Sequence, residues 1–353
     1  MDRYTAIGLQ LSFWVAQTRK EYKKNLEYIS QCIDAAMYLD FSFPIKLIVL
    51  PEGSIQGFAD ELLRWDHVKA ARKLMIEIPG EETEALGKKA KEYGCYIVAT
   101  ARALEPKVVK DRYFNVAFII NPKGEVIYKR HKLQTYLPEP SLVPHDIWDR
   151  WVEIYGCDLN AFYPVADTEI GRIGALICYE GSFPEIARGL AMNGAEVLTR
   201  VSYPEPWVGE GWWEIQSRAR ALDNTCYLIA VNSGLIYFQE GQMEGVDMSG
   251  GNSMIVDYRG NIVSRHASSS SSVVGTTIDI EQLRDYRCRV LLGNWLKELR
   301  TEQYKLIYEE PIYPKNLYLN VPPPKERSKR DKIHRESIEK LCKRGTWVRP
   351  GKR

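Results

Sequence analysis

The cysteine at position 178 has the setting most suited to chemistry. The stretch from Gly174 to Glu185 begins with a short apolar run that ends at Cys178, and Gly181 and Pro184 then interrupt the chain. The β-branched residues of the run favour a buried strand, and Pro184 fits the first turn of a following helix. Cys178 is therefore predicted at a strand-to-helix corner, where unpaired N–H groups and the helix dipole lower the pKa of a thiol and can hold an oxyanion. From this segment alone, a small core residue is the commoner explanation of such a cysteine.

Glu52 also follows a buried strand. The continuous apolar run over 46–50 is typical of a strand covered on both faces, and Glu52 comes just after it, between a proline and a glycine. A helix cap or a solvated charge explains this position poorly, so we predict that Glu52 faces a site. The alternative is a surface glutamate that ends the strand.

Lys132 comes at the end of a predicted hairpin. Strands are predicted over 113–120 and 125–129, joined by a turn-rich tetrapeptide, and the second strand runs into a cluster of cations. Lys129 and Arg130 are predicted to lie on a solvated edge, whereas Lys132 precedes a leucine and is predicted to turn inward. Glu139 lies just beyond, between two prolines.

Glu52, Lys132 and Cys178 thus all lie at or just past a strand end, and the carboxyl edge of such sheets is where sites are built. A thiol is mostly protonated near neutral pH, so a nucleophilic cysteine needs a base and a nearby positive charge, which Glu52 and Lys132 supply. The 5 histidines have no context that matches a papain-like pair. No cluster of His, Cys and Asp has metal-ligand spacing, so we expect no metal site.

The composition is that of an ordinary globular protein. The chain has 353 residues, of which 45% are hydrophobic and 27% charged, and its net charge of +2 gives no reason to expect nucleic acid or an acidic membrane surface as a partner. No apolar run approaches the length of a membrane span, and the first residues lack the order of a signal peptide. The 7 cysteines are scattered without a Cys-x-x-Cys pair, which fits a reducing compartment. We expect a cytoplasmic protein.

The elements that must position these residues alternate between strands and helices. Apolar alternation predicts a first strand over 4–11, and apolar residues at steps of three and four predict a helix over 20–39. Further helices are predicted over 79–93, 184–193 and 212–222, and further strands over 95–101, 195–199, 226–231, 254–256, 261–263 and 273–280. This order predicts an α/β fold with mixed sheets.

Two stretches do not fit this alternation. Residues 141–163 are aromatic and irregular, which indicates a lid or an interface segment, or else an aromatic plug over the core. Residues 281–353 are predicted to form a C-terminal extension beyond a domain over 1–280. We interpret its basic end as a surface tail, or one that wraps a neighbouring subunit, rather than a nucleic-acid site.

Three segments resemble, in order, the catalytic motifs of the nitrilase superfamily of carbon–nitrogen hydrolases. They are Val49 to Glu52, Arg130 to Leu133 and Leu176 to Glu185, and the family's Glu-Lys-Cys triad falls on Glu52, Lys132 and Cys178. The resemblance covers roughly residues 4–280, and the extension is similar to that of the aliphatic amidase and formamidase branch. It implies an α-β-β-α sandwich that pairs across subunits into an eight-layered dimer, often within a larger homo-oligomer, and it implies no cofactor.

The resemblance also implies a role for each residue. Glu52 would take the thiol proton and pass it to the leaving amine, while Cys178 attacks the amide carbonyl and water later cleaves the thioester. Lys132 would stabilise the tetrahedral oxyanion together with the backbone N–H of Tyr179. Glu139 stands where amidases carry a further glutamate, and it would orient the substrate or the hydrolytic water.

The expected activity is hydrolysis of a small or medium carboxamide to a carboxylic acid and ammonia. The alternatives are hydrolysis of N-carbamoyl amino acids or nitriles, and a non-catalytic interaction protein that keeps the fold. Nitrilases commonly have tryptophan where this chain has Tyr179, which disfavours nitriles. The length of the 141–163 stretch indicates acyl groups bulkier than those of formamide or acetamide.

The residues after Cys178 bear on the carbamoyl alternative. Carbamoyl amino acid hydrolases typically carry an arginine soon after the cysteine to hold a carboxylate, whereas this chain has Gly181 and Ser182 there. This disfavours such substrates, although Arg200 could serve instead. Tyr203, in the same segment as Arg200, is a further candidate for substrate contact.

Overall fold

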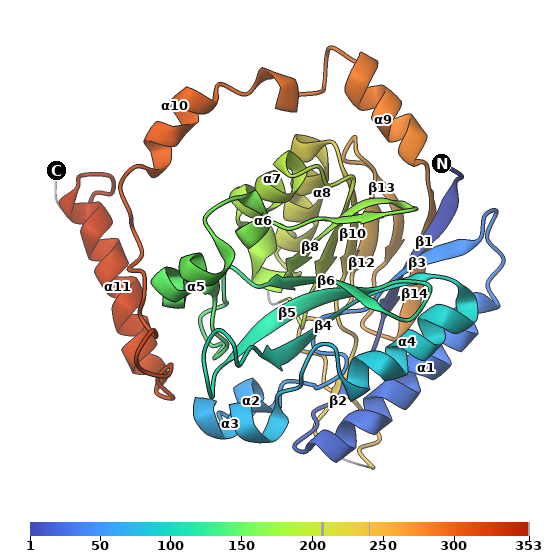
Figure 1. Ribbon diagram of the computed structural model, residues 1–353, viewed down its shortest axis with the longest axis horizontal. Coiled ribbons are helices and arrows are strands. Elements are labelled where there is room, and N and C mark those ends of the chain that lie inside the picture. The colour runs from blue at the N-terminus through green and yellow to red at the C-terminus, as the bar shows by residue number, and fades with distance from the viewer. Residues whose placement is uncertain (206–207, 240, 352–353) are drawn as a thin grey trace.

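Two six-stranded sheets form the centre of the computed structural model, which describes residues 1–205, 208–239 and 241–351 (Figure 1). The strand order is β14-β1-β3-β4-β5-β6 in the first sheet and β13-β12-β10-β9-β8-β7 in the second. The strands of the first sheet are β1 (Tyr4–Gln10), β3 (Ile45–Val49), β4 (Tyr96–Leu104), β5 (Tyr113–Ile120), β6 (Val126–His131) and β14 (Ser272–Ile278). Those of the second sheet are β7 (Ala166–Thr168), β8 (Gly171–Ile177), β9 (Val197–Val201), β10 (Tyr227–Val231), β12 (Ser253–Val256) and β13 (Ile262–His266). A separate short pair consists of β2 (Phe13–Trp14) and β11 (Ile236–Tyr237).

Apolar side chains fill the space between the two sheets. In β8, Ile173 and Ile177 point into this space, whereas Leu176 packs on the opposite face, because successive side chains of a strand alternate between faces. Leu47 and Val49 of β3 join the same inner core from the first sheet. The central strands are thus apolar on both faces, which explains why their sequences read as continuous apolar runs.

Helices cover the outer face of each sheet (Figure 1). Helices α1 (Tyr22–Met37) and α4 (Glu81–Tyr93) pack their apolar stripes against the first sheet, and α7 (Pro184–Met192) and α8 (Trp212–Asn224) pack against the second. Ile29 and Leu86 contribute to the first outer core, and Leu190 and Trp213 to the second. The layers therefore follow the order α-β-β-α, which confirms the predicted architecture.

The stretch over 141–163 differs from the irregular loop that its sequence predicts. It contains the 3₁₀ turn η2 (Pro144–Ile147) and the helices α5 (Trp148–Tyr155) and α6 (Leu159–Phe162). The side chains of Ile147 and Trp151 are buried in the core outside the first sheet, so these residues serve as an aromatic plug. The helices were not predicted because short helices with one apolar face look irregular when only a turn or two of periodicity is available.

The remaining helices are short or belong to the extension. They are α2 (Ala59–Leu62), α3 (His67–Leu74), α9 (Ile280–Arg289), α10 (Thr301–Lys305) and α11 (Arg327–Lys343), with the 3₁₀ turns η1 (Arg19–Glu21), η3 (Cys178–Ser182), η4 (Leu296–Glu298) and η5 (Leu306–Tyr308). Within the described residues, no helix has both the length and the apolar character needed to cross a membrane.

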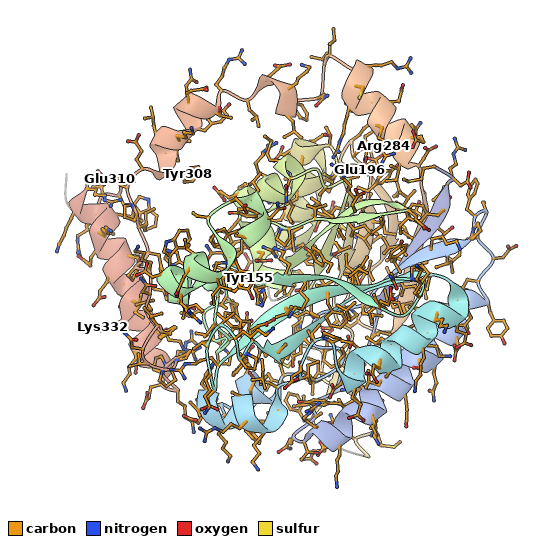
Figure 2. All side chains as sticks on the ribbon, viewed as in Figure 1. Tyr155, Glu196, Arg284, Tyr308, Glu310 and Lys332 are labelled. Carbon is orange, nitrogen blue, oxygen red and sulfur yellow. The ribbon has the colours of Figure 1, made fainter. Side chains whose placement is uncertain are left out.

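The C-terminal extension runs as an arch from α9 to α11 (Figure 1). At its root, Ile280 and Leu283 are buried in the core between the sheets, and Arg284 of α9 reaches Glu196 with Nε and Oε1 2.6 Å apart (Figure 2). The arch then passes through α10 and ends at α11, which lies beyond α5. The C-terminal end of the extension thus lies beside the domain of its own chain.

Candidate active site

The carboxyl ends of strands from both sheets meet at one cavity. Strand β6 is antiparallel to β5, which is antiparallel to β4, so β6 runs in the same direction as β3 and β4. Lys132 directly follows β6, Cys178 directly follows β8, and Glu52 follows β3. The structure brings these three residues together with Glu139 in the lining of a cavity of about 150 Å³.

Lys132 is held between two carboxylates. Its Nζ donates to Glu52 Oε1 at 3.0 Å and to Glu139 Oε2 at 2.6 Å, and all three side chains are buried. Burial alone would lower the pKa of Lys132, but the charges of Glu139 and Glu52 raise it well above its ordinary value. Lys132 therefore remains an ammonium in the site at any physiological pH.

Asn115 bridges the same two carboxylates, a role that the sequence did not lead us to predict. Its Nδ2 donates to Glu52 Oε1 at 2.6 Å and to Glu139 Oε1 at 3.0 Å, and Ser141 Oγ donates to Glu139 Oε1 at 2.7 Å. These donors allow two like charges to share a small buried volume. The available signal was a lone amide within the apolar strand β5, because a polar residue in such a strand needs a partner.

Cys178 occupies a strained backbone position. Its φ is +52°, in the left-handed region that non-glycine residues rarely adopt, at the first residue of the turn η3 that joins β8 to α7. Such strain commonly marks functional positions, where the surrounding structure enforces it. Cys178 lies between the end of β8 and the start of α7, which has Pro184 in its first turn. This confirms the predicted strand-to-helix corner.

The predicted lowering of the Cys178 pKa is wrong. The side chain is only 8% exposed, and burial together with the charge of Glu52 raises the pKa of the thiol well above its ordinary value, while Lys132 offsets this only in part. The helix dipole favours a thiolate, but the cost of burying a thiolate at this position is larger. The resting cysteine is thus a thiol, which needs a base to remove its proton at the moment of attack.

Backbone contacts from Tyr203 hold Glu52 in place. The N–H of Tyr203 donates to Glu52 Oε2 at 2.8 Å, and its carbonyl oxygen lies 4.0 Å from Cys178 Sγ. The Tyr203 ring packs so closely on Gly53 that a Cβ there would lie 2.7 Å from it, and Gly53 has a φ of +80°. Glycine is therefore required next to Glu52.

Aromatic and acidic side chains form the rest of the cavity wall. Tyr179 lines it beside Cys178, and its ring centroid is 5.9 Å from that of Tyr136. Two more carboxylates, Glu61 and Glu205, also line it, and burial raises the pKa of Glu61 to about 7 even though Arg102 lies against it. The described residues of the lining thus include four carboxylates and a single cation. The complete described lining is Glu52, Phe58, Glu61, Leu62, Lys132, Tyr136, Glu139, Cys178, Tyr179, Tyr203, Pro204, Glu205 and Met248.

Arg200 lies behind this wall rather than in it. It is fully buried, and its Nη2 donates to Gln216 Oε1 at 2.7 Å and lies 3.5 Å from Glu205 Oε2. A Cβ on Gly181 would lie 2.1 Å from Arg200 Nε. The lack of a side chain at Gly181, three residues after Cys178, therefore leaves room for the Arg200 guanidinium. Arg200 is not among the lining residues.

Arg130 is buried, so its predicted place on a solvated edge is wrong. Its Nη1 and Nη2 donate to the two carboxylate oxygens of Glu180 at 2.5 and 2.9 Å, and both side chains are almost fully buried. Strand alternation could have found this, because side chains two residues apart share a face, and an inward Lys132 requires an inward Arg130.

Within the described residues, no group of three or more His, Cys, Asp and Glu side chains is placed to hold a metal ion. The arrangement instead offers a thiol, a carboxylate base and a buried ammonium around one small cavity. Such a set can perform acyl transfer by nucleophilic catalysis, with the ammonium stabilising a developing oxyanion.

Comparison with known sequences agrees with this geometry. The sequence model of the family described as Carbon-nitrogen hydrolase matches residues 6–288. The formamidase of Helicobacter acinonychis (strain Sheeba) is 28% identical over 254 residues, which cover 70% of this chain and 69% of that protein. The formamidase of Bacillus cereus (strain Q1) is 31% identical over 252 residues, which cover 69% and 68%.

Solved structures show the same fold. Saccharomyces cerevisiae Nit3, a member of branch 10 of the nitrilase superfamily, superposes with a TM-score of 0.63 at 25% identity, over 82% of this chain and 95% of that one. A mutant of the amidase from Nesterenkonia sp. AN1, which carries the acetamide moiety of fluoroacetamide on its active site cysteine, gives a TM-score of 0.60 at 16% identity, over 86% and 96%.

Proposed function

The chain belongs to the carbon–nitrogen hydrolase family, and we propose that it hydrolyses a small carboxamide to a carboxylic acid and ammonia through a thioester on Cys178. It is a hydrolase of non-peptide carbon–nitrogen bonds. The observation that carries the proposal is the buried Lys132, held at 3.0 Å from Glu52 and 2.6 Å from Glu139 in the cavity that Cys178 lines.

Acylation begins with removal of the thiol proton. Glu52 takes this proton as Cys178 Sγ attacks the amide carbon, which avoids a free buried thiolate, since burial and Glu52 itself disfavour one. Lys132 Nζ and the backbone N–H of Tyr179 stabilise the oxyanion of the tetrahedral intermediate. Glu52 then gives its proton to the amide nitrogen, the carbon–nitrogen bond breaks, and ammonia leaves.

Deacylation repeats these roles with water as the nucleophile. Glu52 takes a proton from water, the hydroxyl attacks the thioester carbonyl, and the carbon–sulfur bond breaks as the proton returns to Cys178 Sγ. Glu139 has both carboxylate oxygens engaged, by Lys132 on one side and by Asn115 and Ser141 on the other. Its role is therefore to orient Lys132.

The cavity indicates a short acyl group. Its volume of about 150 Å³ is small beside the roughly 300–1,000 Å³ of drug-sized sites, and residues 141–163 are absent from its described lining. The sequence led us to expect an acyl group bulkier than that of acetamide. The cavity volume instead indicates an acyl group of only a few carbons. The reason is that the 141–163 stretch packs on the core and supplies no described lining residue, although Ser141 at its start donates to Glu139.

Charge disfavours the carbamoyl amino acid alternative. A substrate carboxylate would lie beside Glu61 and Glu205, while Arg200, the one candidate to hold it, is enclosed behind Glu205. Like charges in a partly desolvated cavity repel strongly. We therefore favour amides whose acyl group has no negative charge.

The test is mass spectrometry of the intact protein during turnover of short primary amides, with ammonia release measured in parallel. The wild type is expected to release ammonia and to show an added acyl mass, and Cys178→Ala is expected to lose both. Cys288→Ala, which removes an exposed thiol, is the matched control and is expected to keep both. Equal ammonia release from wild type and Cys178→Ala would contradict the thioester route.

We also propose that the arch of the extension packs against a second copy of this chain. Leu291, Leu292, Leu306, Ile307 and Tyr308 lie on the arch with 60–91% of their surface exposed, an unusual apolar stretch for a free surface. Replacing Leu292 and Ile307 by serine is expected to lower the mass measured by light scattering to that of a smaller assembly. An unchanged mass would contradict this packing.

Finally, we propose that the protein works in the reducing cytoplasm. All seven cysteines lie among the described residues, and all are free thiols. Cell fractionation with an antibody to the chain would test this location.

A further inference from the structure

The segment that carries Glu139 is difficult to hold by ordinary backbone pairing. Prolines flank Glu139, and because proline has no N–H, residues 138–140 offer three carbonyl groups but a single N–H. That N–H already donates to the carbonyl of Tyr136 at 2.9 Å. The backbone position of residues 138–140 therefore depends on the groups that donate to the three carbonyls.

Two side chains from distant parts of the chain are the donors. On one side, His67 Nδ1 donates to the carbonyl of Pro140 at 3.0 Å. On the other, Arg330 Nη1 donates to the carbonyls of Pro138 at 3.0 Å and Glu139 at 2.9 Å. Arg330 belongs to α11, so the C-terminal helix contacts the turn that carries a residue of the cavity.

The geometry of α11 points Arg330 inward. Lys332, two residues later, lies on the outer face of the helix with 79% of its side chain exposed (Figure 2). Two residues correspond to about 200° of rotation in an α-helix, so Arg330 faces the core. Its Nε is buried as well.

The extension is anchored where it reaches this site. The N–H groups of Asn316 and Tyr318 donate to the carbonyls of His145 and Asp146, each at 3.0 Å, and Asn316 Oδ1 accepts from the N–H of Asp149 at 3.0 Å. The side chains of Tyr318 and Leu319 pack on the core outside the first sheet. The stretch over 141–163 thus serves as the platform on which the extension docks.

We propose that Arg330 is a positioning residue for the amidase reaction, and that the C-terminal extension thereby completes the active site of its own chain. The proposal rests on the function proposed above for Glu139. Glu139 holds Lys132 at 2.6 Å, and Lys132 in turn holds Glu52 at 3.0 Å, so a shift of the Glu139 turn moves the oxyanion donor and the base together. A displacement of about 1 Å in such an array can lower a rate about 100-fold.

The experiment compares Arg330→Ala with Arg335→Ala in the full-length chain, with a short primary amide as substrate. Arg335 is exposed on the same helix, so the control removes the same side chain without touching the Glu139 turn. We expect Arg330→Ala to lower kcat about 10- to 100-fold with KM changed less than about threefold, and Arg335→Ala to keep both.

Two further measurements separate positioning from simple loss of structure. Guanidinium at millimolar concentration is expected to restore part of kcat to Arg330→Ala and to leave Arg335→Ala unchanged, because it can occupy the vacated site. Arg330→Lys, which keeps a cation on a flexible stem, is expected to fall between wild type and Arg330→Ala.

A wild-type kcat in Arg330→Ala would overturn the proposal, as would a loss that neither guanidinium nor the lysine variant reduces. These outcomes are distinct from failure of the amidase assignment, which would appear as absence of ammonia release by the wild type itself.

Discussion

The guanidinium of Arg130 and the carboxylate of Glu180 join the two sheets at the active site. Arg130 precedes Lys132 by two residues, and Glu180 follows Cys178 by two, so this buried pair fixes Lys132 relative to Cys178. Glu180 also accepts from the N–H groups of Leu133 at 2.6 Å and Ile177 at 2.7 Å. One carboxylate thus holds both backbone segments.

Breaking this pair is expected to be costly. Arg130→Met leaves the Glu180 carboxylate buried without its counter-charge, so the free energy of unfolding should fall by about 3–5 kcal/mol in chemical denaturation. Arg289→Met, which removes the same side chain from the exposed pair with Asp285, should leave the unfolding midpoint unchanged. Similar unfolding midpoints for the two variants would show that the Arg130–Glu180 pair does not stabilise the fold.

Asn115 should matter for rate, because it donates to both Glu52 and Glu139. Asn115→Leu removes these two hydrogen bonds and leaves the carboxylates to repel one another. We expect kcat to fall by up to about 100- to 1,000-fold, the loss typical of removing one preorganised hydrogen-bond donor from an active site. Steady-state kinetics would measure this, with circular dichroism to check that the variant is folded. A wild-type kcat would mean that Lys132, Ser141 and the Tyr203 N–H hold the two carboxylates without help from Asn115.

Substrate charge should control selectivity. Propionamide, 3-aminopropanamide and succinamic acid carry neutral, positive and negative acyl groups, and succinamide, which has the size of succinamic acid without its charge, controls for size. Because four carboxylates and one cation are the charged residues in the described lining, kcat/KM for succinamic acid should be at least about tenfold below that for propionamide. The ammonium compound should match or exceed propionamide.

Glu61→Gln provides the matching variant for this series. At about pH 8, where a Glu61 carboxyl with a pKa of about 7 is mostly ionised, removing its charge should narrow the ratio of kcat/KM between the neutral and the negative substrate, whatever its effect on the absolute rates. A preference of the wild type for succinamic acid would contradict the proposed effect of charge. It would instead favour N-carbamoyl amino acids as substrates.

Asp146 should make stability depend on pH. This residue lies in the platform of the extension, and burial raises its pKa to about 7 from a usual value of 3.8, despite the hydrogen bond from the Val143 N–H. Between these values the folded state holds a proton that the unfolded state releases, so stability is greatest at low pH within this window and falls as pH rises from about 4 to about 7.

Asp146→Asn removes this titration but keeps an acceptor for Val143. We therefore expect the variant to be more stable than wild type at pH 8, with the difference shrinking as the pH falls toward 4, in thermal unfolding across that range. Parallel curves for the two proteins would contradict the raised pKa.

Much of this protein could be predicted from local pattern. The apolar runs before Glu52 and Cys178 predicted buried strands, because a strand covered on both faces needs apolar side chains on both. The proline at position 184 placed the start of α7, since its fixed φ suits a first turn. Three such motifs in order indicated the family, its architecture and its chemistry, and Glu52, Lys132, Glu139 and Cys178 do line one cavity.

Only the tertiary structure decided what depends on burial and on contacts between distant residues. The direction of the Cys178 pKa shift and the enclosure of Arg200 follow from how much water reaches each group, which no local pattern records. The contact of Arg330 with the Glu139 turn joins residues 191 positions apart. Packing of the whole chain sets such contacts, so the sequence singled out Glu52, Lys132 and Cys178 as candidates, while the folded structure determined how deeply each is buried and what holds it in place.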